Sequence, residues 1–192
     1  MNIALSPRAA LNLIETAVGK SGDIRDQKFK RVREEIFPAI HFALYLKRAG
    51  HGENLILSRD SPDISFVKAE DIIRNAARGS IPAFPMEITS IRDNDFQLAA
   101  GSDSSEKIVN ILTLGKFQKR YEPQTILLVV IEVDTIFDPK RIAELISSCR
   151  HYFHQIWFKT RLTDTRFQLI QIYPALAGGE YDTKGDFQDI MY

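Results

Sequence analysis

The sequence has only one cysteine among its 192 residues, Cys149, and no excess of charge of either sign. One cysteine cannot form an intramolecular disulfide, and no signal-peptide pattern is present, so we expect a cytoplasmic protein. The 25 basic and 25 acidic side chains cancel, which argues against nucleic-acid binding through overall charge. The longest purely apolar run, 126–131, is far shorter than the roughly 20 residues that cross a bilayer. We therefore expect no membrane association.

Common sequence motifs of nucleotide and metal sites are also missing. The sequence has no GxGxxG or GxxxxGK[ST] loop, so it does not support nucleotide binding by either. Cys149, His151 and His154 fall within six positions, but a zinc site needs further ligands at fixed spacing. We favour an ordinary buried thiol at a helix end. No base is specified that would make Cys149 a nucleophile.

What is present is the composition of a globular protein, with 44% hydrophobic and 26% charged residues. The length favours one domain. We expect an N-terminal helix over 1–22, an α/β core over 23–173 and a loosely ordered C-terminal tail over 174–192. No pattern indicates a homo-oligomer.

The order of periodic segments predicts an α/β fold in which helices flank a mixed central sheet. Pro38 should kink or divide the second helix, and Ser104 or Ser105 should cap the third major one. The segment 125–133 is apolar throughout, so we expect it at the centre of the sheet. Predicted helices cover 6–18, the region from Asp23 to Gly50, 69–78, 104–121 and 139–146, and predicted strands cover 55–57, 63–67, 86–91, 125–133, 155–158 and 167–172.

Two carboxylates stand on neighbouring predicted strands. Asp63 opens one strand directly after Pro62, and Glu87 lies between apolar residues of the next. If the two strands pair, both carboxylates can face one patch of the sheet, where a divalent cation such as Mg²⁺ would relieve their repulsion. The simpler interpretation is that Asp63 is a turn residue and Glu87 a solvent-facing strand residue.

The order of these pieces, over about residues 23–158, resembles the PD-(D/E)XK nuclease superfamily, which has the restriction endonuclease-like fold. Pro62-Asp63 matches the first motif and Glu87-Ile88-Thr89 the second, and 87 − 63 = 24 positions separate the acids. The resemblance implies Mg²⁺-dependent hydrolysis of DNA phosphodiester bonds by an endonuclease or exonuclease. It makes Asp63 and Glu87 metal ligands, with Glu35 of the preceding helix completing the catalytic site.

One departure from the family pattern bears on activity, because the second motif should end in lysine and here ends in Thr89. Either Lys107 or Lys68 replaces that lysine, or the protein is a catalytically inactive member that binds DNA or protein. An unrelated enzyme with a site at the sheet edge is a third interpretation. Gln118 and Tyr121 resemble a glutamine–tyrosine pair of some exonuclease branches, with a spacing of three instead of four.

Basic residues gather in two segments of the chain, although the total charge of the chain is zero. In a nuclease both groups should border the site and contact phosphates, whereas ordinary solvated helix faces are the alternative. The aromatic group at 152–158 could stack on bases, but we favour core packing. The predicted nucleic-acid contacts are Lys28, Lys30, Arg31, Lys119 and Arg120.

Overall fold

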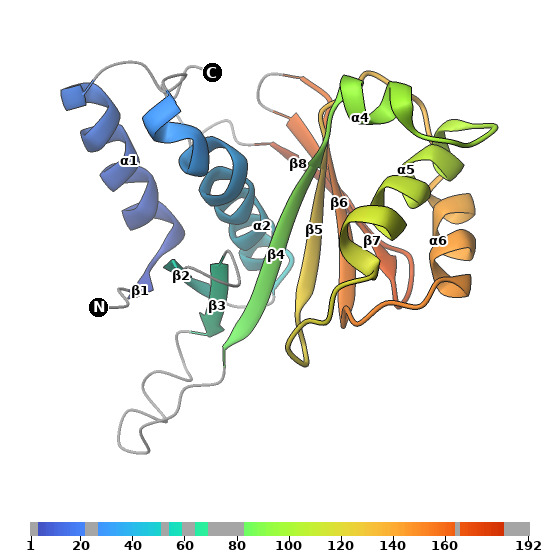
Figure 1. The fold of residues 1–192 in the computed structure, drawn as a ribbon. Helices are drawn as coiled ribbons and strands as arrows, with labels where there is room; N and C mark the ends of the chain where they lie inside the picture. Colours follow the sequence, from blue (N-terminus) through green and yellow to red (C-terminus); the bar gives the residue numbers. More distant parts are fainter. Residues whose placement is uncertain are drawn as a thin grey trace. The chain divides into compact units, whose positions relative to one another are not determined.

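The computed structural model describes residues 4–21, 27–50, 54–58, 64–68, 83–163 and 166–182. It is a mixed α/β structure, as predicted, and contains both antiparallel and parallel strand pairs (Figure 1). The chain forms two compact units, one of residues 1–88 with 182–192 and one of residues 89–181. In the part of the chain that is described, no helix has the length and apolar character needed to span a membrane.

The first unit combines helices with antiparallel strands. Next to Pro38 the second predicted helix changes type without a break, because a π-helical turn, η2, ends at Ile36 and α2 begins at Phe37 with the proline in its first turn. Ser6 begins the first helix, where its hydroxyl accepts the amide of Ala9 at 3.1 Å. The elements are β1 (Ala4–Leu5), α1 (Pro7–Ser21), η1 (Gln27–Phe29), η2 (Val32–Ile36), α2 (Phe37–Arg48), β2 (Asn54–Ser58), β3 (Ile64–Lys68) and β4 (Phe84–Ile91), which runs on into the second unit.

Strands β1 to β4 pair successively and antiparallel. Residues 64–67 of β3 are all buried. Within this unit the Phe66 ring lies 5.8 Å from that of Phe42 on α2. Burial of such apolar side chains against the helix holds β3 in place, at about 25 cal/mol for each Å² removed from water.

In the second unit, helices cover one face of the strands (Figure 1). Strands β5 and β6 are parallel and joined through α6, β6 and β7 are antiparallel, and β8 neighbours β7. All six residues of β5 are buried, as its apolar sequence predicts. The core of this unit includes Ile108 of α5, Ile142 of α6 and Phe158 of β6. The elements after β4 are α4 (Asp93–Leu98), α5 (Ser104–Leu112), η4 (Thr113–Phe117), β5 (Ile126–Ile131), α6 (Pro139–Ser148), β6 (Gln155–Arg161), β7 (Arg166–Tyr173) and β8 (Ala177–Asp182).

Three local features differ from the sequence prediction, and the predicted helix over 69–78 lies outside the described residues. Residues 93–98, which lie outside every predicted helix and strand, make α4, whose first turn carries Asp93 and Asp95, a favourable place for negative charge. Asp103 caps α5 instead of a serine, because its carboxylate accepts the amide of Glu106 at 2.8 Å. The expected loose tail contains β8, where Gly178 allows a close backbone approach to Leu169.

Candidate functional site

The strand pair that the predicted metal site requires is present in the first unit. Ile64 pairs with Met86 in the antiparallel ladder of β3 and β4. Ile64 directly follows Asp63 in the sequence, and Met86 directly precedes Glu87. Glu87 is half-buried on β4, whereas Asp63 lies outside the described residues. The condition that the two strands pair is therefore met.

Glu35, the predicted third acid, already has a cationic partner. It lies in η2, and its Oε2 accepts Arg31 Nε at 2.7 Å. In the pair one residue earlier, Lys30 Nζ lies 3.9 Å from Glu34 Oε2. Arg31 and Lys30, both predicted phosphate contacts, thus each engage a carboxylate four residues on, which reduces the net positive field of this helix face. Lys28, the third predicted contact here, belongs to η1.

The two lysines predicted to take the role of the missing motif lysine lie in different parts of the fold. Lys68 is exposed at the end of β3 that is opposite the Ile64–Met86 pair. Four residues of an extended strand separate it from Ile64, a distance of about 13 Å. Lys107 belongs to α5 in the second unit, where its Nζ lies 5.2 Å from the centre of the Phe96 ring. Thr89 is half-buried on β4.

The structure identifies a buried cation that the sequence analysis did not single out. Lys159 of β6 is only 7% exposed. Burial lowers the pKa of its amine to about 7, and the nearby Glu132 carboxylate opposes that shift. Glu132 accepts hydrogen bonds from the Ser90 hydroxyl at 3.2 Å and from Arg92 Nε at 2.9 Å. The available signal was a charged residue within a strand, directly after the apolar run Ile156-Trp157-Phe158.

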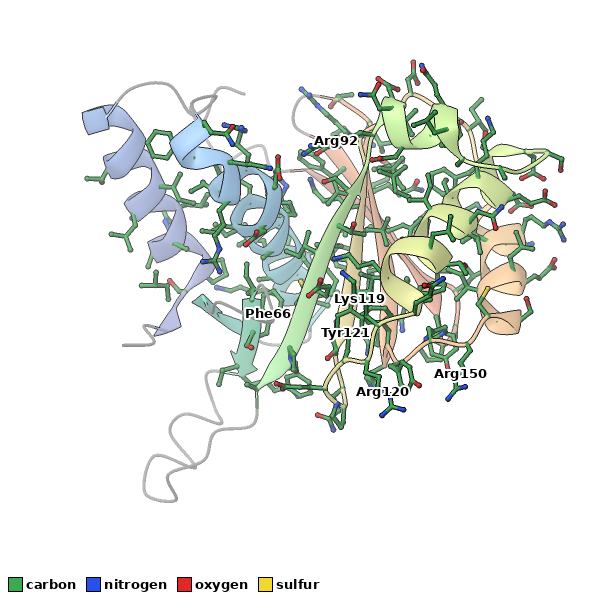
Figure 2. The ribbon with its side chains drawn as sticks, in the orientation of Figure 1. Phe66, Arg92, Lys119, Arg120, Tyr121 and Arg150 are labelled. Carbon is green, nitrogen blue, oxygen red and sulfur yellow. The ribbon has the colours of Figure 1, made fainter. Side chains whose placement is uncertain are left out.

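The other two predicted phosphate contacts, Lys119 and Arg120, are exposed just beyond η4 (Figure 2). Between them and Pro123, Tyr121 is half-buried, and its ring lies 4.5 Å from the Phe153 ring. Gln118 and Tyr121, the pair that resembles a glutamine–tyrosine pair of exonucleases, therefore have different environments. Gln118 is exposed, while Tyr121 packs among aromatic rings. Lys119 and Arg120 are available to a ligand.

The aromatic and histidine group at 149–158 packs mainly as core, as favoured from the sequence. Phe153, Trp157 and Phe158 are buried, whereas Tyr152 and His154 are exposed. Burial lowers the pKa of His151. Cys149 donates its thiol hydrogen to the Leu145 carbonyl at 3.3 Å. No three metal-binding side chains come together among the residues that the structure describes.

A surface hollow of about 520 Å³ lies where α5 and α6 begin. Its acids already serve the helices, since Asp103 caps α5 and Asp138 accepts the Lys140 amide at 2.9 Å. Its cation, Arg141, donates to Glu106 at 3.2 Å. The charged groups of the hollow thus stabilise the helix starts.

Comparison with known proteins identifies no relative of this chain. No protein-family model, no curated protein and no solved structure matches this chain. The candidate site is therefore defined by its residues and their geometry.

Proposed function

We propose that this protein hydrolyses DNA phosphodiester bonds with Mg²⁺, on a fold of the restriction endonuclease type. Asp63 and Glu87 would hold the metal, and Glu35 would complete the site. The observation that supports this proposal is the antiparallel register of β3 and β4, in which Ile64 pairs with Met86. That register joins the strand that follows one acid to the strand that carries the other.

The proposed ligands suit the metal, because all are carboxylates and Mg²⁺ prefers hard oxygen donors. When bound, Mg²⁺ would lower the pKa of a coordinated water and stabilise charge that develops on the phosphate. Within the chain, Arg31 holds the Glu35 carboxylate through their 2.7 Å contact. This contact fixes the orientation of the Glu35 carboxylate.

The second candidate function is a catalytically inactive protein that binds DNA or another protein through the same fold. The observation in its favour is the lysine position. Thr89 occupies the motif site on β4, and Lys68 lies at the end of β3 away from the Ile64–Met86 pair. A missing cation would remove one group that stabilises negative charge in the transition state.

Cleavage assays distinguish the two functions. Plasmid and single-stranded DNA are incubated with wild type in Mg²⁺ or Mn²⁺, beside Glu87→Gln and Asp63→Asn. Glu144→Gln is the matched control, because Glu144 is an exposed acid on α6, 72% exposed in its side chain. We expect Glu87→Gln and Asp63→Asn to lower the cleavage rate at least 100-fold and the control to leave it unchanged.

Thr89→Lys provides a second, constructive test. The substitution places an ammonium at the motif position, so we expect faster metal-dependent cleavage than in wild type. If wild type and Thr89→Lys both fail to cleave DNA and neither binds Mn²⁺ in calorimetric titrations, the nuclease proposal is rejected in favour of the inactive one. Cleavage that is insensitive to Glu87→Gln rejects the assigned site.

A further inference from the structure

Two segments of the second unit that are distant in sequence pack against each other. The first is the end of η4 with the chain that follows it, and the second is the connection from α6 to β6. The Phe117 ring lies 5.2 Å from that of His151, and the Tyr121 ring lies 4.5 Å from that of Phe153. The His154 amide also donates to the Thr125 carbonyl at 2.9 Å. These contacts hold the two segments together, and Figure 2 shows Arg120 and Arg150 at the same end of the unit.

This end of the unit carries a local excess of positive charge. Residues 116–124 contain three cations and Glu122, and residues 149–154 contain Arg150 and no acid. The sum is 4 − 1 = +3, with histidines counted as neutral, whereas the whole chain sums to zero. We call Lys119, Arg120, Arg150 and Tyr152 the cationic end.

The cations of the cationic end have no carboxylate partner among the described residues. Lys119, Arg120 and Arg150 are all exposed, and none forms an ion pair there. Other arginines of the same unit are paired: Arg92 with Glu132 and Arg166 with Glu180. An exposed cation without a carboxylate keeps its full capacity to neutralise a phosphate.

An exposed aromatic ring accompanies these cations. Tyr152 is 37% exposed, while its neighbour Phe153 is buried. The Arg150 guanidinium lies 5.9 Å from the centre of the Tyr152 ring and donates to its hydroxyl at 3.2 Å. A cation held beside an open ring is the combination that binds a phosphate and stacks on an adjacent unpaired base.

We infer that the cationic end binds single-stranded nucleic acid, with phosphates on Lys119, Arg120 and Arg150 and a base on Tyr152. The inference rests on the proposed function for its choice of nucleic acid, and it names single strands as the form bound. An acidic protein would use the cations but would have no need of the open ring. A duplex keeps its bases stacked within the helix, so it would gain little from Tyr152.

Binding is measured without metal, by fluorescence anisotropy of a labelled 20-nucleotide single strand in EDTA. We expect Arg120→Glu and Arg150→Glu each to weaken binding at least 10-fold. Lys140→Glu is the matched control, because Lys140 is exposed at the other end of α6 and changes the net charge equally. It should change affinity less than threefold. Circular dichroism melts verify that each variant is folded.

Salt and ring substitutions separate the two contributions. Each phosphate-contacting cation adds about 0.7 to the slope of log affinity against log salt for single strands, so Arg120→Gln with Arg150→Gln should reduce that slope by about 1.4. Tyr152→Ala should weaken single-strand binding at least fivefold. Tyr152→Phe, which keeps the ring, should bind like wild type, and a duplex should respond little to Tyr152→Ala.

The outcomes are distinct from those of the cleavage assay. Binding that depends on the cationic end, without cleavage, supports this inference and favours the second candidate function, a catalytically inactive DNA-binding protein. If cleavage depends on Glu87 while the variants of the cationic end bind like wild type, the inference is overturned and the nuclease proposal is kept. If poly-glutamate displaces the strand as well as unlabelled single strand does, the site binds acidic protein and the inference is overturned. It is also overturned if wild type fails to bind the strand at about 20 mM salt, where screening of charges is weak.

Discussion

The amine of Lys159 lies 4.1 Å from the centre of the Phe167 ring, across the antiparallel pair of β6 and β7. The lysine is almost fully buried, and its pKa falls to about 7 because desolvation disfavours the charged form. The ring face attracts a cation, but this attraction does not restore the ordinary pKa. Lys159 is thus a buried group whose charge costs stability.

Lys159→Met should increase stability most at low pH. Below pH 7 the lysine is protonated in both the folded and unfolded states, so the full cost of the buried charge is present. Between pH 7 and about 10 the unfolded chain binds a proton that the folded chain lacks, so wild-type stability rises with pH. At pH 6 we expect Lys159→Met to raise the free energy of unfolding by about 2–4 kcal/mol. Urea unfolding at several pH values measures this.

The comparison with Lys159→Met isolates this lysine from other titrating groups. The gain from the substitution should shrink steadily from pH 7 to pH 10. An equal gain at every pH would mean that methionine simply packs better, and a loss at pH 6 would show that the charge is favourable where it is.

Glu132→Gln should lower the pKa of Lys159 further, because the Glu132 carboxylate raises it in the folded protein. The direct loss of stability should be small, since the ion pair of Glu132 with Arg92 is nearly half exposed and such pairs contribute about 0–1 kcal/mol. NMR titration of the lysine side chain measures the shift. An unchanged Lys159 pKa would contradict the proposed coupling, and Glu144→Gln is the control.

Gly178→Ala should destabilise the protein far more than Gly179→Ala. Gly178 has φ of +135°, and an added Cβ would clash with the Leu169 carbonyl oxygen, whereas a Cβ on Gly179 would meet nothing within 4 Å. The backbone must move to relieve such a clash, so we expect a loss of about 2 kcal/mol or more. Thermal unfolding of the two variants side by side tests this, and equal melting temperatures would show that β8 does not approach β7 so closely.

Asp103→Ala should reduce stability by about 1 kcal/mol, because it removes the acceptor of the Glu106 amide at the start of α5. Asp103→Ser, which can also accept that bond, should recover most of the loss. Asp134→Ala is the control, since Asp134 is an exposed acid outside a helix. Chemical denaturation curves compare the three, and a serine variant as unstable as the alanine variant would contradict a capping role.

Elements with a strong local signal could be predicted from the sequence. The uninterrupted apolar run of β5 implied burial on both faces, and Pro38 implied a kink or division of the second helix, which changes type there. By contrast, α4 is a six-residue helix without a buried residue, so it has no apolar period to reveal it. The cap on α5 was placed one or two residues late, at Ser104 or Ser105, because aspartate and serine are comparable caps.

The candidate sites depend even more on distant contacts. The sequence placed Asp63 and Glu87 next to strand residues, and the register Ile64–Met86 supports that pairing, while the metal role stays a prediction. The ion pair of Glu35 with Arg31 was not anticipated, although its four-residue spacing allows it on one helix face. The sequence did not predict that Arg150 and Tyr152 lie near Arg120, because 30 positions separate Arg120 from Arg150.

The sequence by itself determined the α/β class, most of the helices and strands, and the neutral overall charge, because composition and periodicity act over a few residues. The tertiary structure decided where charge is concentrated and where it is buried. Packing of Phe117 and Tyr121 on His151 and Phe153 gathers three exposed cations at one end of a unit, and pairing of β5, β6 and β7 buries Lys159. Electrostatic energy depends on the distance between charges in space and on their access to water. Neither quantity can be read from the sequence.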